Sequence, residues 1–359
     1  MSDLFGAWVK KLCSQPVNFL ANKVAGSPVV MSTRIRLARN LANLAFPAAE
    51  SAESAAEVAS LVKMALQNTG ALGKNMLTLA NSELNDLERA ILRERHLTSI
   101  KFIQKDHSVL HASGNGQLSI MVNEEDHLHL QAILPGLQFN KAWQQVSGLD
   151  DALSRELDIA FDGTLGYLTA APGNVGTGMR ISVMLHLPAL TLEDNIKPLE
   201  RGLAKLGLNV RGMFGEDSEA AGNFYQISNQ STLGESEAEI IDHFKRVIEQ
   251  IIEHEEAARM KLLDCQRTRL LDKVGRAFGT LRYSYILSAK EAFKALSGVR
   301  LGVDLKLFNS LDLKTVNELF AAVGKGCLQY HAGSRLAEAE LDAMRSQVVR
   351  EKLKHGNAA

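Results

Sequence analysis

Four arginines of this sequence lie in apolar or glycine-rich surroundings, whereas most arginines of folded proteins are exposed. Arg34 and Arg36 belong to the segment STRIRLARN, Arg180 follows the segment GNVGTG, and Arg211 begins the segment RGMFGEDSE. If the first segment is extended, Arg34 and Arg36 point to the same side of the chain. Two forked guanidinium groups could then hold the phosphates of one ligand. For each arginine taken singly, a solvated surface position is the alternative.

Glycines and acidic residues accompany these arginines. The segment GNVGTG could form a backbone nest that approaches a phosphate closely, with a plain tight turn as the alternative. Glu124, Glu125 and Asp126 gather in the segment NEEDH, and Glu216 lies in GEDSE; a solvated turn is the alternative for both. The sequence contains no GxxxxGK[ST] loop and no HRD or DFG set. Any phosphate chemistry must therefore depend on other residues.

Histidines offer a second possible chemistry. His127 and His129 would share one face of a strand, and His107 lies close to His111 along the chain, so either pair could hold a metal ion. No cysteine or acidic spacing completes such a site. We therefore expect no metal-ligating residues.

The elements that position these residues follow from the spacing of apolar side chains. Helical spacing occurs over residues 51–67 and 82–96, and the first 95 residues are mainly helical in pattern. From Ser99 the pattern changes to short runs typical of strands, namely SIKFIQ, SVLHA, LSIMVN and HLHLQAIL, and then residues 166–169, 180–187, 208–213 and 224–228. Helical patterns recur around residues 150–159 and 192–206. The sum predicts an α+β fold, with a mostly antiparallel sheet flanked by helices.

A second, smaller and all-helical domain is expected after this one. Ser236 and Glu239 have the spacing of a capping box, and the residues after them form one apolar helix face. From there to the end the pattern stays helical. We therefore predict a first domain over residues 1–235 and a second over residues 236–359.

Composition narrows the classes of function. The formal net charge of −1 does not favour nucleic-acid binding, which depends on clustered lysine and arginine. The three cysteines show no CxxC spacing, which fits a reducing compartment. No segment has the length and apolar character of a signal peptide or a membrane span. We expect a cytoplasmic protein without nucleic-acid or membrane partners.

Five segments, in the same order, resemble the ATP:guanidino phosphotransferase family and, within it, the bacterial protein-arginine kinases. They are STRIRLARNL, NEEDHL, GYLTAAPGNVGTGMRISVMLHLPAL, RGMFGEDSEAAGNFYQISNQSTLG, and LSAKEAF with RLGVDL. The resemblance covers nearly the entire chain. It implies a phosphagen-kinase-like catalytic domain, with ATP and Mg²⁺ as cofactors.

The resemblance also implies roles for individual residues. Glu124 and Glu125 would position the acceptor guanidinium, with Glu125 as the catalytic base, and Glu216 would help to grip the substrate arginine. The implied nucleotide-binding residues are Ser32, Thr33, Arg34, Ile35, Arg36, His96, His129, Arg180, Ile181, Ser182, Val183, Met184, Arg211, Gly212, Met213, Phe214, Gly215 and Glu216.

The chemistry of the acceptor agrees with these roles. A guanidinium group has a pKa above about 12 and no free lone pair while it is protonated. An enzyme must therefore orient this group and take its proton as the attack proceeds. Paired carboxylates can do both, while arginines and Mg²⁺ stabilise the charge on the transferred phosphoryl group.

The order of the domains indicates the type of substrate. Kinases of free arginine or creatine carry a helical domain before the catalytic one, but here the SxRxR segment already begins at Ser32. A helical region after the catalytic domain is the layout of the protein-directed enzymes. The resemblance thus implies arginine-containing protein substrates marked for stress response or proteolysis, an activator protein, protease machinery and a homodimer.

Three positions depart from the family pattern. His129 replaces an arginine that contacts nucleotide phosphate, and a histidine that is mostly neutral at pH 7 would lower charge stabilisation by about 1 to 4 kcal/mol. Ala171 replaces a cysteine near the acceptor. The phosphoarginine-binding pattern RDxxRA becomes LDAMRS, which keeps Asp342 and Arg345 but begins with Leu341. Two alternatives therefore stay open: a pseudokinase or scaffold that binds nucleotide or a partner, and a kinase of a free guanidino metabolite.

Overall fold

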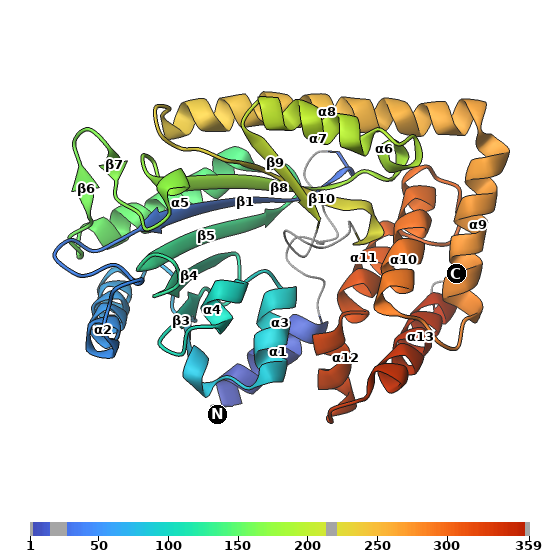
Figure 1. Cartoon of the computed structure of the whole chain (residues 1–359). Coiled ribbons are helices and arrows are strands. Elements are labelled where there is room, and N and C mark those ends of the chain that lie inside the picture. The colour runs from blue at the N-terminus through green and yellow to red at the C-terminus, as the bar shows by residue number, and fades with distance from the viewer. Residues whose placement is uncertain (1–2, 15–26, 213–220, 356–359) are drawn as a thin grey trace.

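The computed structural model describes residues 3–14, 27–212 and 221–355. In this part of the chain, eight strands form one antiparallel sheet in the order β2-β3-β4-β5-β1-β8-β10-β9 (Figure 1). A two-stranded hairpin of β6 and β7 stands apart from it. The strands are β1 (Val30–Arg39), β2 (Leu77–Ala80), β3 (Val109–Ala112), β4 (Leu118–Val122), β5 (Leu128–Pro135), β6 (Phe161–Asp162), β7 (Gly166–Tyr167), β8 (Met179–His186), β9 (Leu208–Gly212) and β10 (Phe224–Asn229).

Helices flank the sheet and then continue alone to the end of the described chain, which confirms the predicted α+β fold with an all-helical region after it (Figure 1). The helices are α1 (Asp3–Ser14), α2 (Ala52–Thr69), α3 (Asp86–Glu94), α4 (Ile100–Ile103), α5 (Phe139–Ser154), α6 (Pro188–Leu192), α7 (Ile196–Lys205), α8 (Glu237–Cys265), α9 (Arg267–Tyr283), α10 (Ala289–Asp304), α11 (Leu313–Ala322), α12 (Lys325–Ala332) and α13 (Glu338–His355). None of these helices has both the length and the hydropathy that a membrane span requires.

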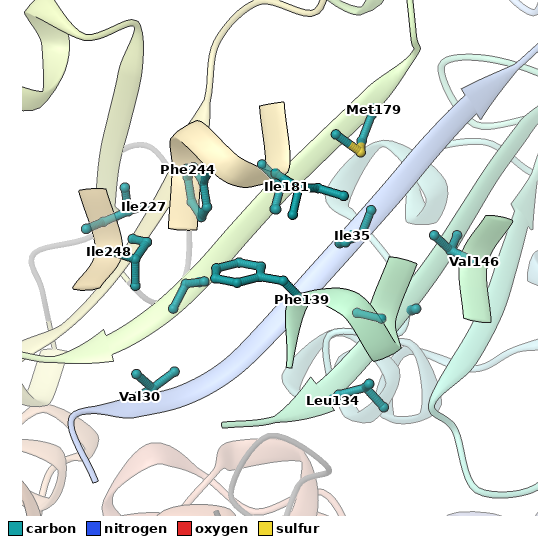
Figure 2. Close-up of a cluster of buried hydrophobic side chains, with 14 of the residues drawn as sticks. Val30, Ile35, Leu134, Phe139, Val146, Met179, Ile181, Ile227, Phe244 and Ile248 are labelled. Carbon is teal, nitrogen blue, oxygen red and sulfur yellow. The ribbon is translucent and has the colours of Figure 1, made fainter. Parts of the chain in front are cut away.

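The two faces of the sheet differ because side chains alternate along each strand. On one face, Ile35 of β1 and Ile181 of β8 are fully buried beneath α5 and α8 (Figure 2). Phe139 of α5 meets Phe244 of α8 in an edge-to-face contact, with ring centroids 5.8 Å apart. Removing this apolar surface from water is the main stabilising contribution to the fold. The opposite face is left to carry polar side chains.

Helix α8 belongs to this apolar core. It begins with the predicted capping box, in which Ser236 and Glu239 bond each other's main-chain amides. Its apolar stripe, which includes Phe244 and Ile248, packs in one cluster with the strands and with α5, and this cluster extends to Leu270 and Val274 of α9. The sequence analysis ended the first domain at residue 235, ahead of this helix. We instead propose a boundary at Gln266, where α8 ends and α9 begins.

The later helices build a second core that reaches the other face of the sheet. Met31, Met184 and Phe224 lie in one cluster with apolar residues of α10, α11 and α13. The rings of Phe224 and Phe320 are 4.9 Å apart at this junction. The helical region therefore covers one end of this second face of the sheet. The rest of that face carries polar side chains.

Two local predictions were wrong. The run SIKFIQ forms helix α4, because the Ser99 hydroxyl accepts a hydrogen bond from the Phe102 amide (3.0 Å) and caps a helical turn. The helix predicted around residues 150–159 begins earlier, at Phe139. Between the helices of the first 95 residues, the segment STRIRLARN is extended and belongs to the central strand β1.

Candidate active site

The four arginines singled out from the sequence share one face of the sheet. Arg36 of β1 is paired directly with Arg180 of β8, and Arg34 with Ser182. Arg211 of β9 is paired with Gln226 of β10, which is in turn paired with Met184 of β8. Residues paired across antiparallel strands point to the same side. We call this side the polar face, defined by Ser32, Arg34, Arg36, Arg180, Ser182, Arg211 and Gln226.

The positive charges on the polar face act on one another. Burial lowers the pKa of Arg34, and Arg36 and Arg180 lower it further. Burial and Arg180 lower the pKa of Arg36 to about 10, against an opposing effect of Glu124 and Glu125. Holding several guanidinium groups together in this way costs stability, and an anionic ligand between them would relieve the repulsion. The polar face is thus suited to a polyanion.

A small pocket opens beside Arg34. The Nε of Arg34 donates a hydrogen bond to the Ser182 hydroxyl (3.2 Å), and Gln131 donates one to the main-chain oxygen of His96 (2.9 Å). Burial lowers the pKa of His96 to about 3, with added repulsion from Arg34 and Arg93, so its ring is neutral at pH 7. The residues lining the pocket are Ser32, Arg34, His96, Ile133, Ser182, Met184 and Gln226.

Four residues of the implied nucleotide set turn their side chains the other way. Ile35, Ile181 and Val183 are fully buried in the apolar core. The Thr33 hydroxyl donates a hydrogen bond to the Gly136 carbonyl (2.7 Å). Side chains alternate between the two faces along a strand, and each of these four residues is adjacent in sequence to a residue of the polar face, so its side chain points to the opposite face. Any contribution of these four residues to the site must therefore come from their main chain.

Part of the implied set cannot be placed. Gly212 ends β9 and is paired with Tyr225. Met213, Phe214, Gly215 and Glu216 lie outside the described residues.

The acidic segment forms the turn between β4 and β5. Glu125 is partly exposed, and its Oε1 lies 2.6 Å from the Nζ of Lys101. Glu124 is buried, and it accepts hydrogen bonds from the Ser99 hydroxyl and from the Glu125 amide (3.0 Å). Because both glutamates act on the pKa of Arg36, the carboxylates lie beside the polar face. The turn therefore joins an anionic edge to a cationic surface.

His129 connects the two buried carboxylates of this turn. Its Nδ1 lies 2.5 Å from an oxygen of Glu124, and its Nε2 lies 3.3 Å from an oxygen of Asp126. Asp126 also accepts hydrogen bonds from the Asn40 side chain (2.7 Å) and the Ala170 amide (2.6 Å). Burial opposes a charge on His129, but the two carboxylates raise its pKa to about 9.

The expectation of a mostly neutral His129 is therefore wrong. The ring is an imidazolium at pH 7, and both of its nitrogens face carboxylates of this turn. The same contacts outweigh burial and lower the pKa of Glu124. His129 thus holds Glu124 in place as an ion, which differs from the phosphate contact implied for it by the family pattern.

Replacing His129 with glutamine is expected to remove a pH-dependent part of the stability. The folded pKa of about 9 exceeds the unfolded value of about 6.5, so the stabilisation is full below pH 6.5 and is lost as the pH rises to 9. The upper limit of this stabilisation is about 3 kcal/mol. Urea unfolding of the wild type and the variant at pH 6.5 and pH 9 measures this contribution. The difference in free energy of unfolding between the two proteins should be larger at pH 6.5. His129→Arg, with a permanent charge, is the control, and an equal loss at both pH values for glutamine would contradict the assignment.

The glycine-rich segment is built as a tight turn rather than as an open nest. Gly176 has a φ of +111°, and a Cβ there would lie 2.4 Å from the Thr232 carbonyl oxygen. Its own carbonyl accepts a hydrogen bond from the Tyr167 amide (2.8 Å). At Gly178, with a φ of +64°, a Cβ would lie 2.5 Å from Nη1 of Arg39. Close packing therefore explains these glycines.

Gly176→Ala should lower the free energy of unfolding by about 2 to 4 kcal/mol, because it adds both backbone strain and steric overlap. Urea unfolding measures this loss. Gly163→Ala is the matched control, since Gly163 is exposed in the β6–β7 turn and a Cβ there meets no atom within 4 Å. Equal effects of the two substitutions would show that the packing at Gly176 is unimportant.

Several residues that support the site were missed by the sequence analysis. Arg39, fully buried at the end of β1, binds Asp150 through Nε (3.1 Å) and Nη2 (2.7 Å). The Tyr167 ring lies 3.3 Å from its Cζ. Arg39 belongs to the same basic segment as Arg34. It is separated from Arg34 by an odd number of positions, so alternation along the strand would have placed its side chain on the opposite face. Nothing in the sequence pointed to Lys101.

The histidine pairs considered as metal ligands are engaged elsewhere. His127 accepts a hydrogen bond from the Leu41 amide (3.0 Å) and lies 3.0 Å from the Ala45 oxygen, while His111 contacts Thr78 (2.9 Å). Across the residues described here, no three or more histidine, cysteine, aspartate or glutamate side chains converge as metal ligands.

The LDAMRS segment lies in α13. The guanidinium of Arg345 is fully buried, donates hydrogen bonds to the carbonyls of Leu287 (2.7 Å) and Val323 (3.0 Å), and pairs with Asp342. In this structure, Arg345 therefore ties α13 to the segments before α10 and after α11.

Two family models match the chain. Residues 57–258 match the ATP:guanido phosphotransferase C-terminal catalytic domain, and residues 267–359 match the protein-arginine kinase McsB C-terminal domain. The gap between the two matches contains Gln266, the boundary proposed above.

Solved structures share the fold at lower identity. Lombricine kinase superposes with a TM-score of 0.58 at 23% identity, covering 71% of this chain and 78% of that one. A duplicated taurocyamine kinase from Schistosoma mansoni gives a TM-score of 0.59 at 24% identity, covering 68% of this chain and 35% of that one.

Closer likeness comes from proteins named protein-arginine kinase. One from Syntrophomonas wolfei is 41% identical over 355 residues, covering 97% of this chain and 98% of that protein. One from Moorella thermoacetica is 44% identical over 338 residues, covering 90% of this chain and 94% of that protein. With the cationic face and the acidic turn described above, these matches place the chain in the ATP:guanido phosphotransferase family, among the protein-arginine kinases.

Proposed function

We propose that this protein transfers the γ-phosphoryl group of ATP to the guanidinium group of arginine residues in other proteins. The observation that carries the proposal is the placement of Arg34, Arg36, Arg180 and Arg211 on one face of the sheet, beside the turn that holds Glu125. A cationic surface binds the polyphosphate, and an adjacent carboxylate receives the cationic acceptor.

The arginines of the polar face hold the ATP phosphates and the charge that develops during transfer. Arg36 has a central place in this arrangement, since it interacts with Arg180, Arg211, Glu124 and Glu125. The phosphoryl group would therefore move past Arg36. The neutral ring of His96 and the Ser182 hydroxyl offer hydrogen bonds in the pocket next to Arg34.

The two glutamates divide the work at the acceptor side. Glu124 is already bound by His129 and Ser99, so it contributes a fixed negative charge. Glu125 is more accessible, with an exposed ion pair to Lys101 that costs little to break. The incoming guanidinium takes the place of the Lys101 ammonium, and Glu125 accepts its proton as nitrogen bonds to phosphorus and ADP leaves.

We also propose that Mg²⁺ takes part. Magnesium in kinases is held by substrate phosphates and water, with one or two carboxylates. The described donor set fits this mode, since carboxylates of the turn lie beside the polar face without forming a cage. When bound, the ion would shield the charge of the phosphates.

The alternative functions can be separated by one experiment. The chain is incubated with Mg-ATP and an unfolded, arginine-containing protein, and phosphosites are mapped by mass spectrometry under conditions that preserve acid-labile P–N bonds. Phosphoarginine in the protein supports the proposal. Nucleotide binding without phosphoarginine would select the pseudokinase, and labelling of free arginine alone would select the metabolite kinase.

The proposal extends to a cytoplasmic homodimer that works with an activator protein and marks substrates for proteolysis under stress. The support for self-association is an exposed apolar group between α9 and α10, where Tyr283, Tyr285 and Ile286 are 75%, 78% and 69% exposed. Light scattering of the purified chain tests this part, and a monomeric mass at micromolar concentration would contradict it.

A further inference from the structure

Two of the three cysteines of the chain meet in the interior. Cys13 of α1 and Cys327 of α12 are separated by 314 positions along the sequence, yet their Sγ atoms lie 3.2 Å apart. Both side chains are buried, at 5% and 1% exposure, and both are free thiols. Cys265, by contrast, is exposed on α8. The buried pair joins the start of the chain to the helical region.

The surroundings of the pair are well packed. Glu94, at the end of α3, accepts a hydrogen bond from the Gly326 amide (2.8 Å) and so holds the start of α12 against α3. A Cβ at position 326 would lie 3.0 Å from side-chain atoms of both Glu94 and Ile91, so α12 approaches α3 closely. Figure 1 shows α1 beneath α3, with α12 beside them. The two sulfur atoms are therefore held near each other by three helices.

A cation lies next to one of the sulfur atoms. Nη2 of Arg95 is 3.5 Å from the Sγ of Cys327 and buried with it. The hydrogen bond between the two thiols lowers the pKa of Cys327 and raises that of Cys13, and Arg95 lowers that of Cys327 further. A thiolate is the reactive form of cysteine, and a neighbouring cation favours it. Cys327 is thus the nucleophile of the pair, with Cys13 as its resolving partner.

We propose that Cys13 and Cys327 are an oxidative modification site, at which a small peroxide converts the two thiols into an intrachain disulfide that fastens α1 to α12. The Cys327 thiolate attacks one peroxide oxygen, the O–O bond breaks, and a sulfenic acid and hydroxide form. The Cys13 sulfur then displaces the hydroxyl group from this sulfenic acid, and water leaves. Two electrons pass from the sulfur atoms to the peroxide. Burial selects a small oxidant over a bulky disulfide.

The disulfide would have consequences at both ends. It would close a covalent loop that contains the whole sheet, so the helical region could no longer separate from the remainder of the chain. It would also convert the Cys327 sulfur that faces Arg95 into a neutral disulfide sulfur. Arg95 directly precedes His96, which lines the pocket beside Arg34, so the oxidised junction borders the polar face.

The test uses the full chain carrying Cys265→Ser, which leaves two thiols. Hydrogen peroxide should reduce the count of reactive thiols in the denatured protein from two to none, and dithiothreitol should restore both. Peptide mapping without reductant should find Cys13 linked to Cys327. The oxidised protein should unfold at a higher urea concentration than the reduced protein, and dithiothreitol should abolish the difference.

The matched control adds Cys13→Ser to the same background. It should form no linked peptide and should show no reductant-dependent shift in the urea midpoint. Three results would overturn the proposal: two thiols that survive peroxide, thiols lost without recovery by dithiothreitol, or a midpoint shift that persists in the control.

Discussion

Replacing Glu125 with glutamine is expected to lower the rate of arginine phosphorylation by about a hundredfold to ten-thousandfold, the range typical for the loss of a general base. Glutamine keeps the size of the side chain and can still accept a hydrogen bond from the guanidinium, but it cannot take the proton. ATP affinity should stay close to that of the wild type, because Glu125 lies at the acceptor side and is paired with Lys101 rather than with the arginines. Single-turnover phosphorylation and an ATP-binding titration measure the two quantities separately.

A matched control for this substitution is Asp106→Asn. Asp106 is an exposed carboxylate in the turn between α4 and β3. Its substitution removes the same charge from a nearby part of the chain but leaves the site unchanged. The control should keep its activity. If Glu125→Gln retained wild-type activity, the base would have to be another group, and if it lost ATP binding as well, misfolding would be the simpler explanation.

Replacing Arg36 with glutamine is expected to lower kcat/KM for ATP by about a hundredfold to a thousandfold. Arg36 interacts with the three other arginines of the polar face and with both glutamates of the turn, so its charge lies where the phosphoryl group is transferred. Stability should respond in the opposite direction. Because burial and Arg180 make the Arg36 charge unfavourable in the free protein, the variant should unfold at an equal or higher temperature.

Two further variants make the Arg36 prediction specific. Arg36→Lys keeps a positive charge but loses the planar fork, so its activity should fall between wild type and glutamine. Arg276→Gln removes an exposed arginine of α9, which is paired with Asp272, and should change kcat/KM little. A large loss of stability in Arg36→Gln would mean that the arginine supports the fold rather than the ligand.

Local sequence patterns predicted much of the catalytic fold. The runs at residues 108–112, 118–123 and 180–187 form strands β3, β4 and β8, and Ser236 with Glu239 caps α8. These features depend on neighbours within a few residues, which is why they can be read from the sequence. The run SIKFIQ was predicted wrongly, because a short apolar run has no clear period and a single serine cap decides its form.

The candidate site was predicted less completely. That Arg34 and Arg36 share a side follows from alternation alone, and the register of β1 with β8 adds Arg180 to them. The same alternation shows why Thr33 and Ile35 face the core, although they belong to the same motif. A motif specifies a segment, whereas the sheet decides which of its side chains reach the ligand.

By itself, the sequence determined the antiparallel strands, the helical region after them, and the alternation that aligns the cationic side chains, since each depends on residue type and local spacing. Only the tertiary structure decided which distant groups meet. His129 carries a charge because Glu124 and Asp126 flank it in a buried turn, and Cys13 meets Cys327 because α3 holds α12 beside α1. The charge of a side chain and its reactivity depend on its burial and on its tertiary contacts, and neither can be inferred from the residues next to it in the sequence.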